Sequence, residues 1–331
     1  MNLLLITGAG ASRSLGEPDD PLPLMPDWSD ALCTALDGAE QGLATACHLA
    51  PGMSGEAFEE ALGLLLRWQQ VRHLEERFAG LGGPNPGLVG GEVMQSRNRT
   101  TTRLQEIVRV VNQTLYDQFG QRRVNDERAV EAYKALLDTQ LDVSGLVVAT
   151  TNYDRAGEAA LAGLGRQVDT GFRNAPGRTP ALEMHGLVES SNAEVTPYLH
   201  LHGSVGWYER EGTVFDHAAD QPFNPSLGTP VVLYPDPEKD PTNDATVSDL
   251  WTEFRVALST ADHVLVLGHS LHDPALVSAI RAAKPRKLAV TIFTDDQAKW
   301  VKKQLPSAIP MRTDFGPELE VDVAAVAAFR G

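Results

Sequence analysis

The chain has 331 residues, 42 % of them hydrophobic, so it can form one large domain or two coupled domains with a buried core. Its 28 basic and 44 acidic residues leave a formal net charge of −16, which disfavours binding to nucleic acid and to anionic membranes. Cys33 and Cys47 are too few for a four-ligand zinc site or a disulfide scaffold. No segment has the pattern of a signal peptide or membrane helix, so we expect a reduced, cytoplasmic protein.

A short apolar strand is the first predicted element. Residues 3–6 are all Leu or Ile, and they run directly into the glycine-rich segment 8–12, with the sequence GAGAS. Short strands in which apolar and polar residues do not alternate are typical of parallel sheets that are covered on both faces. A loop rich in proline and acidic residues follows over residues 17–26.

Residues 28–138 carry the pattern of helices. Apolar side chains recur there every three or four positions, which is the spacing of one buried helix face. The two stripes consist of Phe58, Leu62 and Leu65, and of Leu104, Val108, Val111, Leu115 and Phe119. Residues 80–91 between them are rich in Gly and Pro and are expected to form a loop. We therefore expect an all-helical subdomain over residues 28–138.

Strand patterns return after residue 138, and helix patterns separate several of them. The expected strands are 146–149, 198–204, 231–234, 263–267 and 288–293, with a helix that begins at Pro274. Such alternation indicates the α/β class, with an open, mostly parallel, Rossmann-like sheet. We expect residues 1–27 and 139–331 to form this sheet domain, with the large helical insertion placed after the first strand.

Ligands bind outside the carboxyl ends of the strands in open parallel sheets, and four predicted strands end in suitable segments. In the first, residues 8–12, glycines directly after a strand let backbone N–H groups approach a pyrophosphate. Arg13 stands where the dehydrogenase fingerprint requires its third glycine, so that fingerprint is absent. The alternative interpretation of the segment is an ordinary tight turn.

Polar side chains follow the strand predicted over 146–149. Asn152 and Asp154 offer a carboxamide and a carboxylate, which can hydrogen-bond ribose hydroxyls or position a water molecule. The alternative is structural, because Asn and Asp are also common in Asx turns and as helix caps.

Two histidines alternate along the strand predicted over 198–204. The period of two places His200 and His202 on the same strand face, and Gly203 is expected to leave the approach to His202 open. Histidine titrates near neutral pH, so His202 is a candidate general base. A metal-binding pair and a buried core histidine are the alternatives.

The fourth segment follows the strand predicted over 263–267. Asp273 followed by Pro274 is the signature of a helix N-cap and first turn, which by itself explains Asp273. Gly268 and Ser270 are candidates to line an adenosine pocket in the same loop.

In this order, the four segments resemble the sirtuin (SIR2) superfamily, and specifically the SIR2-like domains of bacterial antiphage defence proteins. Residues 8–12 match the family's glycine motif, and residues 150–154 match its Thr-x-Asn-x-Asp segment. Residues 202–203 match its His-Gly pair, while residues 268–270 and Asp273 match its late loop.

Two departures separate the chain from the protein-deacylating sirtuins. Those enzymes usually carry a four-cysteine zinc module, which this chain cannot build, and the Phe-Arg pair expected after the glycine motif is absent from residues 16–20. The long helical insertion in place of the zinc module resembles the NAD-hydrolysing branch. The resemblance therefore implies no zinc, and an NAD hydrolase that cleaves the nicotinamide–ribose bond of its substrate and depletes NAD during infection.

The resemblance also implies a role for each matched residue. Asn152 would hold the ribose and the attacking water, and His202 would act as the base. Thr151 and Asp154 would support the nicotinamide-ribose side. The pyrophosphate would be held by Gly8, Ala9, Gly10 and Ser12, and the adenosine half by Gly268 and Ser270, with Asp273 counted among the NAD-binding residues. Because NAD is anionic, Arg13 or Arg155 is expected to offset the acidic charge of the protein.

Two other functions stay open at this point. A deacylase or ADP-ribosyltransferase would consume NAD only with an acceptor substrate, and a sensor of NAD or ADP-ribose would bind without turnover. The resemblance further implies a homo-oligomer and an ATPase or helicase-like defence partner encoded nearby. The helical region 28–138 is the candidate for subunit contacts, or alternatively a lid. We expect no direct nucleic-acid or membrane partner.

Overall fold

The computed structural model describes residues 2–13, 15–16, 21–53, 57–64, 91–120, 126–137, 145–173, 181–182, 186–189, 194–217, 223–234, 241 and 245–312. The chain divides into two compact units. The sheet unit comprises Met1–Leu24, Gln118–Leu233 and Asp240–Gly331, and the helical unit comprises Met25–Asp117 and Tyr234–Lys239. Among the described residues, no helix is both long enough and apolar enough to cross a membrane.

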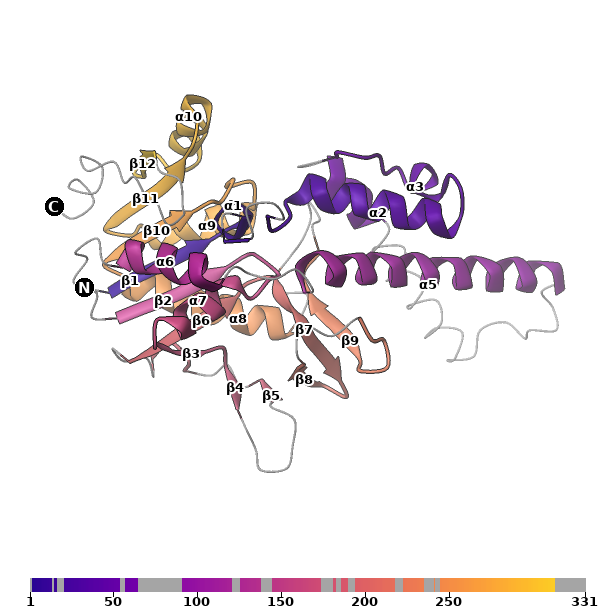
Figure 1. Ribbon diagram of the computed structural model, residues 1–331, viewed down its shortest axis with the longest axis horizontal. Helices are drawn as coiled ribbons and strands as arrows, with labels where there is room; N and C mark the ends of the chain where they lie inside the picture. Colours follow the sequence, from indigo (N-terminus) through magenta and orange to yellow (C-terminus); the bar gives the residue numbers. More distant parts are fainter. Residues whose placement is uncertain are drawn as a thin grey trace. The chain divides into compact units, whose positions relative to one another are not determined.

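A seven-stranded sheet is the centre of the sheet unit (Figure 1). Its strands lie in the order β12-β11-β10-β1-β2-β6-β3, and every neighbouring pair is parallel. The strands are β1 (Asn2–Thr7), β2 (Gly145–Thr150), β3 (Gln167–Asp169), β6 (Val195–His200), β10 (His263–Leu267), β11 (Lys287–Ile292) and β12 (Ile309–Arg312). The predicted α/β class with an open, Rossmann-like parallel sheet is therefore confirmed.

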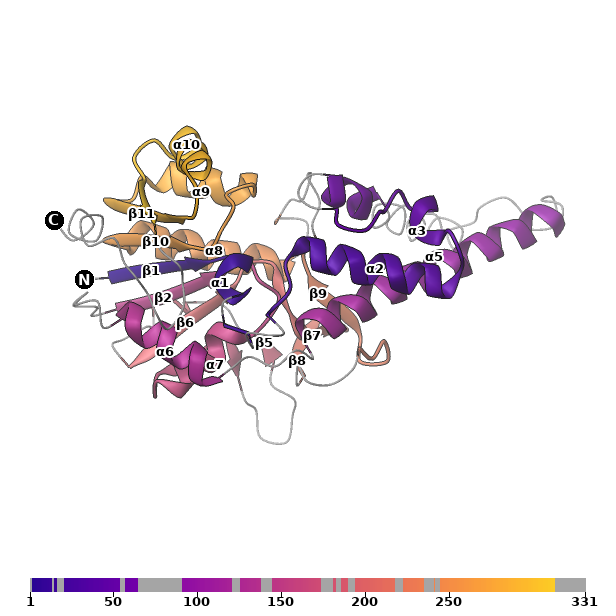
Figure 2. The same cartoon turned by 45° about the horizontal axis from the view of Figure 1, so that its top comes forward.

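Helices cover both faces of this sheet. They are α1 (Ala9–Arg13), α6 (Asp126–Leu137), α7 (Ala156–Gly163), α8 (Ala245–Thr260), α9 (Pro274–Ala283) and α10 (Asp295–Gln304). Successive side chains of β1 point to opposite faces, so Leu4 packs in one core cluster with α8, α9 and α10, and Leu5 in the other with α6 and α7. Figure 2 shows α6 and α7 together beside β2 and β6. Both faces of β1 are buried, which explains its uninterrupted apolar sequence.

The sheet unit also contains a second sheet, which has five antiparallel strands. Its order is β4-β5-β8-β7-β9, formed by β4 (Phe172–Arg173), β5 (Ala181–Leu182), β7 (Gly203–Arg210), β8 (Thr213–Asp216) and β9 (Thr229–Val232). The strand predicted over 231–234 corresponds to β9, which thus belongs to this antiparallel sheet rather than to the parallel one.

The prediction of one strand over 198–204 is wrong. β6 ends at His200 in the parallel sheet, and β7 begins at Gly203 in the antiparallel sheet. The backbone changes direction at Gly203, which has a φ of 73°, a value that side-chain-bearing residues rarely adopt. A Cβ atom at this position would collide with the Val231 carbonyl. Gly203 therefore permits close strand packing rather than leaving an open approach to His202.

The helical unit contains α2 (Met25–Ala39), α3 (Leu43–Ala46), a helical segment at 57–64, and α5 (Gly91–Phe119), whose last two residues belong to the sheet unit. Trp28 and Phe58 are fully buried and pack edge to face, with ring centroids 5.4 Å apart. Burying one such side chain stabilises a fold by about 1.5–3 kcal/mol. Leu62, Val111 and Leu115 of the predicted stripes are buried, whereas Leu104, Val108 and Phe119 are half-buried.

The compact units differ from the predicted division at residue 138. The helix α6 lies within the stretch predicted as the insertion, but its Ala129, Tyr133 and Leu136 pack in the core cluster under the parallel sheet. Its apolar face therefore belongs to the sheet unit. The predicted loop at 80–91 lies outside the described residues apart from the first residue of α5. Leu65 and residues 17–20 also lie outside them.

Candidate functional site

The four predicted segments lie at one edge of the parallel sheet. Residues 8–12, 151–154, 200–203 and 268–273 come at or directly after the ends of β1, β2, β6 and β10. The strands β10, β1, β2 and β6 are consecutive neighbours, and all run in the same direction. The topology therefore brings the carboxyl ends of all four strands together, which is where open α/β sheets bind ligands.

Glycines pack the backbones of the first and fourth segments together. The N–H of Gly8 donates to Leu267 O and the N–H of Gly10 donates to Gly268 O, both at 2.9 Å. A Cβ atom at Gly8 would lie 2.8 Å from Gly268 O, closer than side-chain carbons come. These positions therefore require glycine for the approach of the two loops. Both N–H groups are therefore already hydrogen-bonded within the protein and are not the donors for the predicted pyrophosphate contact.

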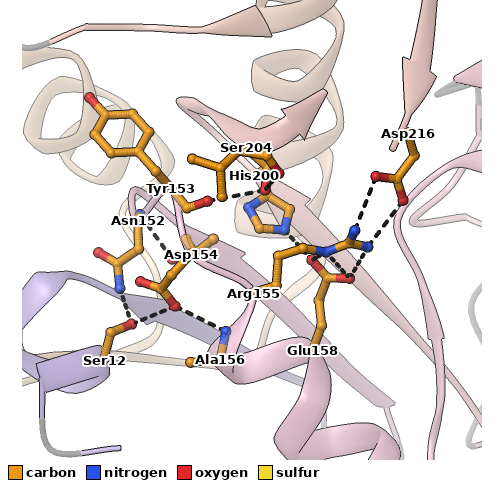
Figure 3. A network of polar contacts seen from close by, with 12 residues as sticks. Ser12, Asn152, Tyr153, Asp154, Arg155, Ala156, Glu158, His200, Ser204 and Asp216 are labelled. Atoms are coloured by element: carbon orange, nitrogen blue, oxygen red, sulfur yellow. Dashed lines mark hydrogen bonds and ion pairs between the residues drawn. The ribbon is translucent and has the colours of Figure 1, made fainter. Parts of the chain in front are cut away.

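Ser12 joins the first segment to the second. The Asn152 side-chain amide donates to Ser12 Oγ at 2.6 Å, and Ser12 Oγ donates to Asp154 Oδ1 at 3.1 Å (Figure 3). The donation from Asn152 Nδ2 leaves its carbonyl oxygen, Oδ1, to accept from another group. Three of the predicted site residues thus form one hydrogen-bonded chain across two strand ends.

Asp154 is a buried carboxyl group, with 5 % of its surface exposed. Burial raises its pKa above the ordinary value, while the hydrogen bonds from the Ala156 N–H and the Ser12 hydroxyl lower it by smaller amounts. Asp154 Oδ1 also accepts from Ala156 N, two residues on, at 3.0 Å. The Asx turn considered as an alternative is therefore present, and the same carboxyl group is also held towards Ser12.

A cluster of partly buried charged groups and the buried His200 lies beside this chain. His200 Nε2 is 2.6 Å from Glu158 Oε1, and Arg155 reaches both Glu158 Oε2 at 2.9 Å and Asp216 Oδ1 at 3.0 Å (Figure 3). Burial alone would raise the pKa of Glu158, but the hydrogen bond with His200 and the charge of Arg155 lower it to about 2. Glu158 is therefore ionised, and His200 donates to it through Nε2.

This cluster corrects two expectations. His200 and His202 do not act as a pair on one strand face, because His200 binds Glu158 whereas His202 binds Asp273. Arg155 is held by two carboxylates, so its charge is already balanced within the protein and does not offset that of an anionic ligand. Sequence spacing showed neither pairing, since the partners come from different elements.

His202 and Asp273 join the third segment to the fourth. His202 Nε2 lies 2.9 Å from Asp273 Oδ2, and both side chains are buried. The other carboxyl oxygen, Oδ1, accepts from the N–H groups of Ala275 at 2.9 Å and Leu276 at 3.1 Å. The predicted N-cap is thus confirmed, and the same residue also orients His202. Since Asp273 accepts on both oxygens, His202 donates from Nε2, and a neutral His202 carries its lone pair on Nδ1.

The rest of the fourth segment has an unusual backbone. Gly268 and Leu271 both have φ values of 57°, and Leu271 is nevertheless buried. The Leu271 N–H donates to His269 Nδ1 at 2.9 Å, which supports this left-handed turn. Ser270 is exposed, and its carbonyl accepts from Trp300 Nε1 at 3.0 Å. A non-glycine residue held in this conformation indicates a loop whose shape is set by its surroundings.

Backbone contacts join the second segment to the third. The Thr151 N–H donates to Thr7 O at 3.1 Å, which continues the β1–β2 ladder by one residue. The Tyr153 carbonyl accepts from Val205 N at 3.0 Å and from Ser204 Oγ at 3.1 Å. These two donors lie just beyond His202, so the segments that carry Asn152 and His202 are tied to each other.

The contacts form a closed ring. The first segment binds the second through Ser12, and the second binds residues 204–205, directly after the third, through the Tyr153 carbonyl. The third binds the fourth through His202, and the fourth binds the first through Gly268. Sequence patterns found the four segments but not these contacts, and Tyr153 and Glu158 were not among the predicted site residues.

The described residues contain no group of three or more His, Cys, Asp or Glu side chains that could hold a metal ion. Cys33 and Cys47 are buried free thiols in the helical unit, and burial raises the pKa of each.

One family model matches part of the sequence. Residues 146–294, slightly less than half of the chain, match the model of the SIR2-like domain. No curated protein matches the sequence significantly. The chain is similar in structure to a Sir2 homologue solved with NAD, at 14 % identity and a TM-score of 0.38, covering 88 % of this chain and 78 % of the other.

Two further solved structures are similar. A mutant Sir2 homologue in complex with 2′-O-acetyl ADP-ribose has 15 % identity and a TM-score of 0.37, with 88 % and 79 % of the two chains covered. A structure described by the mechanism and regulation of Sir2 enzymes has 14 % identity and a TM-score of 0.39, with 91 % and 83 % covered. The residues that match the family model include the second, third and fourth segments of the ring.

Proposed function

We propose that the protein is an NAD hydrolase that converts NAD and water to nicotinamide and ADP-ribose. The observation that carries this proposal is the closed ring of four segments, in which a carboxamide, two carboxyl groups and a histidine are held at one sheet edge. The match of residues 146–294 to the SIR2-like domain supports NAD as the substrate.

The reaction breaks the bond between ribose C1′ and the nicotinamide nitrogen. The electron pair of that bond stays with the pyridine ring, which leaves as neutral nicotinamide, and the oxygen of water bonds to C1′. One proton must leave the water molecule. Because positive charge develops on the ribose before the new bond is complete, the site has to supply acceptors, a base and a fixed position for the water.

Asn152 is suited to hold the ribose or the water. Its Nδ2 is engaged by Ser12, which orients the carboxamide and leaves Oδ1 to accept a hydrogen bond from a hydroxyl group or water. Asp154, fixed by the same serine, places a carboxyl group beside it, and in the ionised form it would stabilise positive charge on the ribose.

His202 is suited to act as the base. Asp273 accepts from Nε2 and thereby favours the tautomer with its lone pair on Nδ1, which can take a proton from water or a ribose hydroxyl. The resulting positive imidazolium would be stabilised by the same carboxylate. Asp273 is itself fixed by two backbone N–H groups at the start of α9, so the acceptor is rigid.

The proposal is tested by incubating the purified protein with NAD and following nicotinamide release. We expect release by the unaltered protein, with losses of about 100-fold or more in the Asn152→Ala and His202→Ala variants. Asp30→Ala, a change in the helical unit, is the control that should keep the activity. Unchanged rates in both site variants would sink the catalytic assignment.

The same assay separates the other functions. NAD consumption that starts only when an acylated peptide or another acceptor is added would indicate a deacylase or transferase. Saturable binding of NAD with no product would indicate a sensor.

We further propose that NAD depletion serves antiphage defence, alone or with a neighbouring ATPase or helicase-like protein. This rests on the resemblance of the four segments to bacterial defence proteins. In phage-challenged cells, NAD should fall with the unaltered gene and stay level with the Asn152→Ala gene; equal NAD levels in the two strains would refute the defence role.

A further inference from the structure

Tyr153 lies between two proposed site residues, Asn152 and Asp154, but its side chain takes no part in their hydrogen-bonded chain. Its ring extends away from the Ser12–Asp154 pair (Figure 3). The residue is 7 % exposed, so this large side chain is almost fully buried. A buried tyrosine needs a partner for its hydroxyl group, and the identity of that partner is informative.

The hydroxyl of Tyr153 donates to the carbonyl of Leu233 at 2.8 Å. The N–H of the same residue, Leu233, donates to the carbonyl of His202 at 2.7 Å. One residue directly after β9 therefore binds the side chain that follows Asn152 and the backbone of the proposed base. Both bonds lie within the sheet unit.

A second connection joins the same two segments at the backbone. The carbonyl of Tyr153 accepts from Val205 N at 3.0 Å and from Ser204 Oγ at 3.1 Å. Tyr153 is thus attached to the His202 turn at two points: its carbonyl binds residues that follow His202, and its hydroxyl group reaches the His202 carbonyl through Leu233. Two attachments at different points restrict rotation of one segment against the other, which a single hydrogen bond would not.

Ring contacts complete the arrangement. The Tyr153 ring packs edge to face on Phe119, with centroids 5.6 Å apart, and lies at an angle to the His202 imidazole, with centroids 6.4 Å apart. A phenylalanine at this position would keep both ring contacts and the backbone bonds. It would remove the hydroxyl group and with it the bond to Leu233, so the effect of the hydroxyl group can be measured separately.

We propose that Tyr153 is a positioning residue that sets the distance between Asn152 and His202 through Leu233. The inference rests on the proposed function, because these two side chains must act on the same ribose. Catalytic groups have to be held to within about 0.5 Å, and a displacement of about 1 Å can cost about 100-fold in rate. Tyr153 itself touches the backbone and the ring of the base, not the reacting atoms.

The test compares Tyr153→Phe with Tyr208→Phe. Tyr208 is a matched control, because it is also buried in the sheet unit and its hydroxyl accepts from Asn224 N at 3.3 Å. We expect kcat for nicotinamide release to fall about 10- to 100-fold in Tyr153→Phe. ADP-ribose binding should change less than about threefold, because the NAD-binding residues are untouched. Tyr208→Phe should lower the melting temperature as much as Tyr153→Phe but leave kcat unchanged.

A second measurement does not depend on activity. In NMR spectra of protein labelled at Asn and His, the signals of the Asn152 amide and His202 ring, assigned from the alanine variants, should both move in Tyr153→Phe. They should stay in place in Tyr208→Phe. Unmoved signals, or a kcat equal to that of the unaltered protein, would overturn the positioning role. Absence of nicotinamide release by the unaltered protein would instead refute the proposed function, and the spectra would then decide on Tyr153 alone.

Discussion

At the scale of single residues, the fold shifts the pKa values of two acidic side chains near the candidate site. Asp154 is a buried carboxyl group and Glu158 a partly buried one, but their pKa values move in opposite directions. Asp154 has hydroxyl and N–H partners that do not outweigh burial, so its pKa rises. Glu158 has His200 and Arg155, so its pKa falls to about 2. The partners therefore decide which form of each carboxyl group the folded state prefers.

The lowered pKa of Glu158 makes a prediction about stability. An acid whose pKa is lower in the folded protein stabilises it above the ordinary pKa, and this contribution is lost as the pH falls towards the folded value. Between the ordinary 4.5 and about 2, the shift corresponds to about 3 kcal/mol. Glu158→Gln should therefore lower the free energy of unfolding by about that amount at pH near 7, measured by denaturant titration.

The difference between Glu158→Gln and the unaltered protein should shrink as the pH is lowered from about 4.5. Glu106→Gln is the control, because Glu106 forms an exposed pair with Arg109 at 2.7 Å, and such pairs contribute about 0.5 kcal/mol or less. A constant loss at every pH would show that Glu158 acts through its shape and not through its charge.

At the scale of secondary structure, the ends of helices and strands position the residues of the candidate site. The start of α9 is the clearest case, since Asp273 caps the helix with one oxygen and orients His202 with the other. The loop before it packs on the glycine turn after β1, and Gly268 makes this possible. A side chain at Gly268 would meet the backbone of Ala11, and its φ of 57° is itself unfavourable for other residues.

Gly268→Ala should therefore lower both stability and activity. The positive φ alone costs an alanine about 1 kcal/mol, and the collision with Ala11 should add about 1–3 kcal/mol. Gly165→Ala is a matched control, because Gly165 has a φ of 77° and nothing within 4 Å of an added Cβ. Thermal melts should show a larger loss for Gly268→Ala, and only this variant should lose NAD turnover. Equal losses would mean that loop packing contributes nothing beyond the backbone conformation.

At the scale of the whole molecule, the charge of −16 affects any association between copies. The resemblance to defence proteins predicts a homo-oligomer, and we retain this as a proposal. Copies of like charge repel one another, and salt weakens that repulsion because the screening length falls from about 14 Å to about 6 Å between about 0.05 M and about 0.3 M salt.

Light scattering of purified protein should therefore show a mass above that of one chain, and the assembled fraction should increase with salt. A single-chain mass at every salt and protein concentration would contradict the proposed oligomer. An assembled fraction that decreases with salt would show that opposite charges, not apolar contacts, hold the copies together.

Local patterns in the amino-acid sequence were enough to predict the strands β1, β2, β10 and β11, the N-cap at Asp273 and the positions of the four candidate segments. Each of these depends on neighbouring residues: an uninterrupted apolar run, a glycine after a strand, or Asp before Pro. The same local patterns also showed the order of the four segments along the chain, and the family resemblance rests on that order.

Only the tertiary structure decided which of these residues meet. Ser12 binds Asp154 across 142 positions, His202 binds Asp273 across 71, and Tyr153 binds Leu233 across 80. The split of the strand at Gly203 and the packing of α6 on the sheet were likewise settled by long-range contacts. Such pairings depend on which strands become neighbours in the sheet, and a local residue pattern carries no information about that choice.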